Sequence, residues 1–351
     1  MELELIELYK KSLYSLSYEE LENIVISMGE KKFRAKQIYE DIIGLKVDNI
    51  DEINRIPKSL REKLAKKYVV FNMNAVDFRA DKERNTVKYL LKTRDFYGIE
   101  CVLLKYKHGY TICISTQVGC RMACDFCAST VGGKKRDLTY SEMLQQIAIV
   151  SKKEGVRISN VVLMGIGEPL DNYNNVISFL NLVSSDMGFN ISMRKITVST
   201  CGIVPRIYQL ADENLQITLA ISLHQTNDEK RSGIMPINRA YNIAKLNEAI
   251  DYYIAKTSRR VSIEYALIKG VNDTKEEAET LVKMYKNKLI HINLIPLNTV
   301  KDKSHRASTK KSVDAFLNHL VKNGLNATVR REMGGSDDIA AACGQLVMTS
   351  N

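Results

Sequence analysis

The sequence contains no long apolar run. None of its 351 residues lies in a stretch that approaches the ~20 consecutive apolar residues of a membrane-spanning helix. The opening residues, MELELIELYKKSLYSL, also lack the basic start and apolar core of a secretory signal. We therefore expect a cytoplasmic protein that is not associated with a membrane.

Several catalytic motifs are also absent. The chain has no Walker phosphate loop, no HExxH zinc motif and no GxSxG nucleophile turn. The segment GIGEPL begins like a dinucleotide-binding fingerprint at Gly165, but Leu170 stands where the third glycine belongs. The segment is better explained by a close backbone approach at Gly167 beside a carboxylate, Glu168, that suits an ammonium group.

Acidic residues are fewer than basic residues. Lysine and arginine together number 51 and aspartate and glutamate 41, which gives a formal net charge of +10. Each basic pair can by itself be an ordinary solvated surface, because such pairs are scattered along the whole chain. Their summed excess favours a polyanionic partner. Nucleic acid is the first candidate, because lysine and arginine side chains bind phosphates.

The cysteines are few, odd in number and unevenly placed. Four of the seven lie between Cys113 and Cys127, which suits reduced thiols and metal ligands better than a secreted disulfide framework. Three of them form the spacing Cys120-x-x-x-Cys124-x-x-Cys127. A closed zinc or electron-transfer iron-sulfur site takes four ligands. The triplet therefore predicts a metal centre with one position open, where a substrate can bind.

The pattern of apolar residues divides the chain at about residue 90. Residues 1–90 look helical and basic, with a capping box at Ser17 and Glu20 and further helices over 34–43 and after Pro57. Two extended runs, 86–92 and 97–107, are followed by strand-like segments that alternate with helical patterns. The expected strands are 110–116, 158–165, 195–200, 216–223, 260–268, 290–297 and 326–331, and the expected helices are 141–152, 173–186, 240–256, 274–287 and 310–323.

This series predicts an α/β fold in which a parallel sheet curls into a partial barrel of the (βα)6 type. A small N-terminal helical accessory domain, 1–90, would precede a core of 91–351. In such sheets the functional loops follow the carboxyl ends of the strands. Five of the expected strand ends carry polar or motif residues, although each alone can be a turn, cap or core residue. They are the cysteine triplet, GIGEP, Ser199-Thr200, Ser222-Leu223-His224 and Asn298.

The cysteine triplet after the first strand of a βα barrel, followed by GEP, resembles the radical S-adenosylmethionine (SAM) enzymes. Further stretches are similar to the adenine carbon-2 RNA methyltransferases, and the resemblance covers most of the chain. These stretches are ICISTQVGCRMACDFCAST, VVLMGIGEPLDN, ITVSTCGIVP, AISLHQTNDEKRSGIMPIN and AACGQL, with FRAKQIY in the helical region. These motifs, in this order, indicate the family far more specifically than the cysteine triplet alone.

The resemblance implies a cofactor site. Cys120, Cys124 and Cys127 would ligate a 4Fe-4S cluster, and the amino and carboxylate groups of SAM would bind the fourth iron. Reduction by the cluster would release a 5'-deoxyadenosyl radical from SAM. Two SAM molecules would be used per turnover, and an external donor would supply the electron. The positions implied to contact SAM are Gly167, Glu168, Ser199, Ser222, Leu223, His224 and Asn298.

A radical is needed because carbon 2 of adenine lies between two ring nitrogens and is electron-poor. The resemblance implies that Cys343 accepts a methyl group as S-methylcysteine, and that a carbon radical formed there adds to carbon 2. Glu100 would accept the carbon-2 proton. Cys113 would be the resolving thiol, forming a disulfide with Cys343 and releasing the RNA. Cys101 and Cys201 match no such role and are expected to pack in the core.

Three interpretations of the function stay open. The leading one, implied by the resemblance, is carbon-2 methylation of an adenosine of 23S ribosomal RNA at the peptidyl transferase centre, and of the adenosine next to the anticodon in transfer RNAs. The second is carbon-8 methylation of ribosomal RNA, as in related antibiotic-resistance methylases. The third belongs to a different class: a non-catalytic RNA-binding protein stabilised by a closed zinc site. In each case we expect a monomer.

Overall fold

A single large sheet organises the molecule. The computed structural model describes residues 10–45, 47–297, 305–330, 341 and 344–346. In this part of the chain, ten strands form one open sheet in the order β14-β13-β12-β11-β10-β9-β6-β5-β4-β3. Neighbouring strands from β6 to β14 are parallel, whereas β3 to β6 are antiparallel. The predicted α/β fold and partial barrel are therefore confirmed, with an antiparallel extension at one edge.

The strands begin and end close to the expected positions. Their bounds are β3 Asn74–Ala80, β4 Thr86–Lys92, β5 Gly98–Tyr106, β6 Gly109–Cys113, β9 Ile158–Leu163, β10 Ile196–Thr200, β11 Thr218–Ser222, β12 Val261–Leu267, β13 Ile290–Pro296 and β14 Ala327–Val329. Along β10 and most of β13, fully buried and partly buried side chains alternate, because successive residues of a strand face opposite sides of the sheet.

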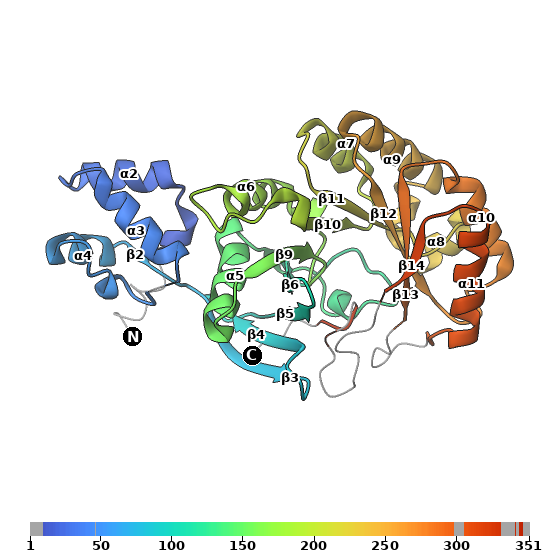
Figure 1. The fold of residues 1–351 in the computed structure, drawn as a ribbon, viewed down its shortest axis with the longest axis horizontal. Coiled ribbons are helices and arrows are strands. Elements are labelled where there is room, and N and C mark those ends of the chain that lie inside the picture. Colours follow the sequence, from blue (N-terminus) through green and yellow to red (C-terminus); the bar gives the residue numbers. More distant parts are fainter. Residues whose placement is uncertain (1–9, 46, 298–304, 331–340, 342–343, 347–351) are drawn as a thin grey trace.

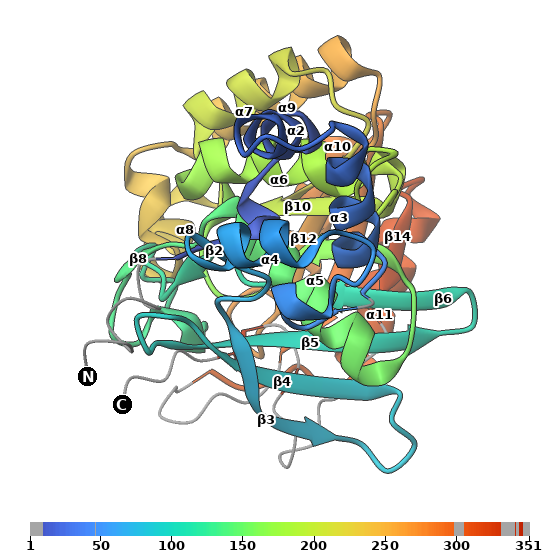
Figure 2. The same ribbon diagram turned by 90° about the vertical axis from the view of Figure 1, so that its left-hand side faces the viewer.

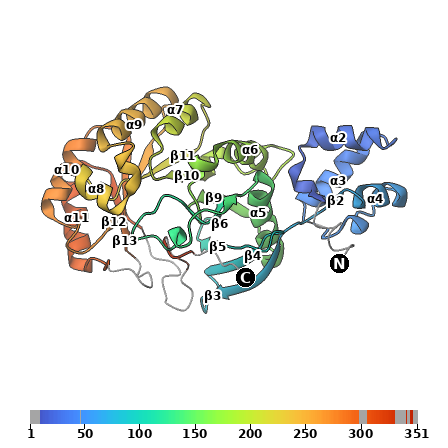
Figure 3. The ribbon, with the colours of Figure 1, turned by 180° about the vertical axis from the view of Figure 1, so that it is seen from behind.

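Helices form an outer layer around the parallel strands (Figure 1; Figure 3). They are α5 Tyr140–Glu154, α6 Tyr173–Ser184, α7 Val204–Asp212, α8 Asp228–Ile234, α9 Ile243–Thr257, α10 Lys275–Tyr285 and α11 Lys310–Lys322. The five expected helices are all present, and α7 and α8 are additional. Helix α5 shows why these helices begin and end where they do. It starts at a capping box of Thr139 and Glu142 and ends at Gly155, which has a left-handed backbone.

The N-terminal helices gather at one end of the molecule beside α5 (Figure 1; Figure 2). They are α2 Tyr18–Ser27, α3 Phe33–Ile43 and α4 Lys58–Ala65, and the short strands β1 Lys11–Ser12 and β2 Tyr68–Val69 pair beneath them. The predicted capping box at Ser17 and Glu20 is confirmed. Tyr140 of α5 donates a hydrogen bond to the carbonyl oxygen of Ser15, at 2.6 Å, which ties the helices to the core.

Strand β3 differs from the expectation of a mostly helical region before residue 90. It pairs with β4 along the edge of the sheet, and most of its side chains are exposed. Residues 76–80, VDFRA, alternate apolar and polar side chains as a strand does, so a sequence signal was present and was overlooked; Val76 and Phe78 are nevertheless exposed at the edge of the sheet. None of the described helices has the length and apolar character needed to cross a membrane.

Candidate functional site

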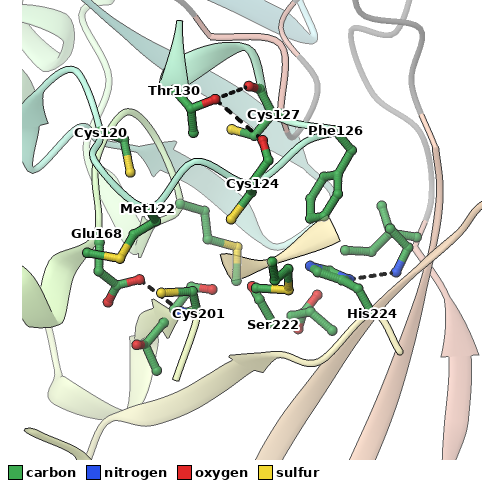
Figure 4. Close-up of a pocket in the computed structure, with 18 of the residues that line it drawn as sticks. Cys120, Met122, Cys124, Phe126, Cys127, Thr130, Glu168, Cys201, Ser222 and His224 are labelled. Atoms are coloured by element: carbon green, nitrogen blue, oxygen red, sulfur yellow. Dashed lines mark hydrogen bonds between the residues drawn. The ribbon is translucent and has the colours of Figure 1, made fainter. Parts of the chain in front are cut away.

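A pocket lies at the carboxyl ends of the parallel strands, where the polar segments were expected to converge (Figure 4). The cysteine loop forms one wall, and the ends of β9 to β13 form the others. Its lining includes Cys120, Met122, Cys124, Phe126, Cys127, Thr130, Gly165, Gly167, Glu168, Ser199, Thr200, Cys201, Ser222, His224, Glu264, Leu297, Arg330 and Gly344.

The sequence-predicted positions fall into three groups. The cysteine triplet, Gly167, Glu168, Ser199, Ser222 and His224 all line this pocket. Leu223 is fully buried, and Cys113 and Glu100 lie on β6 and β5; none of these three is among the described residues that line the pocket. Asn298 and Cys343 lie outside the described residues.

Two short strands close the base of the cysteine loop. β7 Gln117–Val118 pairs with β8 Arg136–Asp137, so that residues 119–135 form a bounded loop. Inside it, the amide of Cys127 donates to the carbonyl oxygen of Cys124 at 3.2 Å. The amide of Ala128 donates to the carbonyl oxygen of Gly344 at 2.8 Å, which joins the loop to the C-terminal segment.

An acidic residue holds this loop against the segment after β9. Asp171 accepts hydrogen bonds from Gln117 and Lys134, each at 2.9 Å, and pairs with Arg121. Burial alone would raise the pKa of Asp171, but these donors hold it below the usual value. The carboxylate is therefore ionised at neutral pH, and it links both arms of the cysteine loop to the GEPLD segment.

Two cysteines of the triplet, Cys120 and Cys124, are neutral thiols in this environment. Burial raises the pKa of Cys120 to about 12 and that of Cys124 further. A metal that binds here must displace the thiol protons, as metal binding to cysteine generally does. Among the described residues, no three His, Cys, Asp or Glu side chains converge closely enough to hold one ion.

This arrangement fits a cluster better than a single ion. A lone zinc ion draws its thiolates around one centre, whereas in a four-iron cluster each cysteine binds a different iron. Three thiols spread along the wall of a pocket match the second case. The pocket beside them would leave room for a ligand of such a cluster.

Glu168 is the buried carboxylate of the site. Its side chain accepts a hydrogen bond from the amide of Cys201 at 2.8 Å (Figure 4) and another from the amide of Leu170 at 2.9 Å. Burial raises its pKa, and these hydrogen bonds oppose the rise. Among the described residues no cation forms an ion pair with it. A buried carboxylate of this kind can receive a positively charged group of a ligand.

Glycines allow the carboxylate to reach this position. A Cβ atom on Gly165 would lie 2.6 Å from the carbonyl oxygen of Ile114, closer than packed atoms approach. Gly167 has a φ of +108°, and a Cβ atom there would lie 2.6 Å from Cβ of Gln117. Only glycine permits this approach between the ends of β9 and β6, so the close-approach interpretation of GIGEP is confirmed.

His224 is a neutral hydrogen-bond acceptor at the end of β11. Burial, with a smaller effect of the Arg231 charge, lowers its pKa to about 3. Its Nδ1 accepts from the amide of Ala266 at 2.9 Å, and the ring of Phe126 contacts its ring edge-on. The ring is thereby fixed between β12 and the cysteine loop.

Cys113 and Glu100 share one face of the antiparallel extension. Cys113 pairs with Val102 across β6 and β5, and Glu100 is two residues from Val102, so the three side chains point to the same side. Glu100 forms a buried ion pair with Lys88 of β4 at 2.9 Å. Cys101 points to the opposite face and packs in the core, as expected.

Sequence reasoning missed three residues of the site. Cys201 is buried as expected, but it also lines the pocket; its thiol pKa is raised well above the usual value by burial and then by Glu168. Lys88 and the fully buried Arg231 were not singled out. Their local patterns resemble those of surface lysines and arginines, and the only signal for Arg231 was its place in the quoted RSGIMPIN stretch.

A parallel βα sheet with a Cys-x3-Cys-x2-Cys loop after its first parallel strand defines a radical SAM protein. Residues 114–285 match the model of the radical SAM superfamily, and residues 11–70 match the model described as the ribosomal RNA large subunit methyltransferase N-terminal domain.

Full-length relatives narrow the class. The chain is 50% identical to "Probable dual-specificity RNA methyltransferase RlmN" of Clostridium perfringens, over 96% of each chain. It is 49% identical to the protein of the same name from Lachnoclostridium phytofermentans, over 96% of this chain and 94% of the other. A crystal structure of a radical SAM methyltransferase from Sphaerobacter thermophilus matches with a TM-score of 0.92 and 38% identity, covering 96% of this chain and 99% of the other. The chain therefore belongs to the RlmN family of radical SAM RNA methyltransferases.

The role of Asp171 can be tested by Asp171→Asn. We expect this variant to lower the free energy of unfolding by about 1–3 kcal/mol, because Lys134 loses a buried ionic partner. Hydrogen exchange of residues 119–135 should become faster, as measured by mass spectrometry. Asp212→Asn is the control, because Asp212 pairs with Lys256 at an exposed site. This variant should lower the free energy of unfolding by less than about 1 kcal/mol. Unchanged exchange in the Asp171 variant would contradict the role of this residue.

Proposed function

We propose that this protein methylates carbon 2 of adenosine in RNA, acting on 23S ribosomal RNA at the peptidyl transferase centre and on the adenosine next to the anticodon in transfer RNAs. The relatives that carry the name dual-specificity RNA methyltransferase support this proposal, because their likeness covers 96% of this chain and 94–96% of theirs. The observation that carries it is the contact between Ala128 in the cysteine loop and Gly344, the residue after Cys343.

Cofactor binding follows from the pocket. Cys120, Cys124 and Cys127 would hold a 4Fe-4S cluster, and the buried carboxylate of Glu168 would receive the amino group of SAM. The cluster and SAM, when bound, supply a carbon radical by one-electron cleavage of the sulfonium. The remaining proposed contacts are Gly167, Ser199, Ser222, Leu223, His224 and Asn298, and two SAM molecules are used per turnover. Because His224 stays neutral, it adds no positive charge beside the sulfonium.

The proposed covalent chemistry belongs to three residues outside the cluster. Cys343 accepts the methyl group and becomes linked through its methylene carbon to carbon 2 of the RNA base. Glu100 removes the carbon-2 proton, and the buried ion pair with Lys88 supports this role because it fixes the position of the carboxylate. Cys113 then attacks the sulfur of Cys343, so that a disulfide forms and the carbon–sulfur bond to the RNA breaks.

Charge supports a role in RNA binding for the N-terminal helices α2, α3 and α4. This region carries exposed basic side chains, among them Lys31, Lys32, Lys36 and Lys58, which suit phosphate contacts. We propose that residues 1–90 form an RNA-contacting accessory domain and that 91–351 form the catalytic core with a C-terminal loop carrying Cys343. We also propose a cytoplasmic monomer that takes its electron from an external donor.

Mass spectrometry of treated RNA tests the function directly. Anaerobically reconstituted protein, incubated with ribosomal RNA, SAM and a reductant, should produce 2-methyladenosine. Cys343→Ala should produce none, because the methyl acceptor is lost. Formation of 8-methyladenosine would instead support the carbon-8 reaction. A colourless wild-type protein that binds RNA and zinc without forming product would support the non-catalytic alternative.

The resolving role of Cys113 predicts a trapped intermediate. Cys113→Ala should accumulate a covalent protein–RNA adduct, seen on a denaturing gel with labelled RNA, because no thiol is left to attack Cys343. Cys101→Ala is the matched control, since Cys101 is the neighbouring buried cysteine on the opposite face of β5. A Cys113 variant that released methylated RNA at the wild-type rate would rule out this role.

The proton-accepting role of Glu100 predicts a different adduct. Glu100→Gln should slow product release by about 100-fold or more, and Lys88→Met should slow it to a smaller extent. With RNA deuterated at carbon 2, the adduct of Glu100→Gln should keep the deuterium, whereas that of Cys113→Ala should lose it. Glu83→Gln, an exposed site in the same extension, is the control. Loss of deuterium from the Glu100→Gln adduct would exclude Glu100 as the base.

A further inference from the structure

A buried arginine lies directly beneath the pocket. Arg231 is on α8, and its side chain is completely shielded from solvent. Its guanidinium donates four hydrogen bonds, to the carbonyl oxygens of Leu223 (3.0 Å), Cys201 (2.9 Å) and Ser222 (3.0 Å) and to Oδ1 of Asn238 (3.0 Å). Three of these four acceptors belong to the ends of β10 and β11, which line or support the pocket.

The positive charge of Arg231 is not matched by direct contact with an anion. All four hydrogen bonds end on neutral oxygens, although buried charges in proteins are normally paired or bound to metal centres. Asp228 bonds to Asn238 rather than to the guanidinium, so it lies one side chain away. Glu168 bonds to the amide of Cys201, and Arg231 bonds to the carbonyl oxygen of the same residue.

Contacts connect the guanidinium to the cysteine loop. Arg231 donates to the carbonyl oxygen of Cys201, and the side chains of Cys201 and Cys124 belong to one buried cluster. On the same helix as Arg231, the carbonyl oxygen of Ile234 accepts a hydrogen bond from the amide of Asp125 at 2.9 Å. Helix α8 therefore lies against the cysteine loop, so that the charge of Arg231 is close to a cluster held there.

We propose that Arg231 is a positioning residue of the radical centre, whose hydrogen bonds fix the ends of β10 and β11 and whose unmatched positive charge stabilises the reduced state of a cluster held by Cys120, Cys124 and Cys127. The inference rests on the proposed cluster. Reduction adds one negative charge to a group that already carries three thiolate ligands. A buried cation nearby favours that step, since net charge and surroundings set the potentials of such clusters.

The reduction potential of the cluster tests the charge directly. Arg231→Gln should lower the ratio of reduced to oxidised cluster about tenfold at a fixed potential, which equals about 59 mV for a one-electron couple. Arg231→Lys keeps the charge and should restore most of the potential. The measurement is an anaerobic redox titration followed by electron paramagnetic resonance, performed without RNA or turnover.

Arg259→Gln is the matched control. It removes one positive charge from the chain, but Arg259 bonds to the carbonyl oxygen of Ile217, at the opposite ends of the strands from the pocket. The reduction potential of the cluster in this variant should equal that in the wild type. A purely structural role for Arg231 would change iron content and stability, and it would leave the potential of the loaded fraction unchanged.

A charge-preserving double variant covers the case in which Arg231→Gln does not fold. Asp228→Asn combined with Asn238→Asp exchanges the two side chains, now joined at 3.0 Å, and places a carboxylate against the guanidinium. The net charge is unchanged, and we expect the potential to fall in the same direction as in Arg231→Gln. If the cluster is intact and its reduction potential is that of the wild type, in Arg231→Gln or in the double variant, the proposed role of the charge is overturned. A wild-type protein that takes up no iron would instead contradict the proposed function.

Discussion

The close approach between the ends of β6 and β9 is the constraint on which the site depends. Because Gly165 and Gly167 have no side chains, the segment after β9 can lie against Ile114 and Gln117. Glu168 is thereby placed where it bonds to the amide of Cys201, and the carbonyl oxygen of Cys201 in turn accepts from Arg231. One path of hydrogen bonds thus runs across the ends of β9, β10 and β11, and it aligns strands that are far apart in sequence.

The same pocket concentrates groups that are costly to bury. Glu168 has a raised pKa, Arg231 has no direct anionic partner, and Cys120 and Cys124 are held as neutral thiols. Removing a charge from water costs several kcal/mol unless it is compensated. Such departures from ordinary packing are typical of functional sites, where a ligand supplies the missing partner. A ligand with both positively and negatively charged groups would offset the cost of burying these residues better than a neutral molecule could.

Much of this arrangement could be predicted from the sequence, and the reasons are local. The parallel strands carry β-branched and apolar residues between helical segments, and the rule that functional loops follow their carboxyl ends places the triplet, GIGEP and Ser222 in one pocket. Strand β3 was overlooked although residues 76–80 alternate apolar and polar side chains, because the segments before it are helical and basic. Arg231 and Lys88 escaped it for a different reason: burial of a charged residue depends on contacts between distant segments, and the residues around it carry no sign of them.

The proposed chemistry is divided between two parts of the fold. The triplet and Glu168 lie at the carboxyl edge of the sheet, whereas Glu100 and Cys113 lie on the antiparallel extension, where Glu100 pairs with Lys88. Under the proposed function, Cys343 connects the two parts by carrying the methyl group. Gly344 directly follows this cysteine in the sequence, and its carbonyl oxygen accepts a hydrogen bond from the cysteine loop. This contact supports a methyl carrier that belongs to the chain rather than a diffusible molecule.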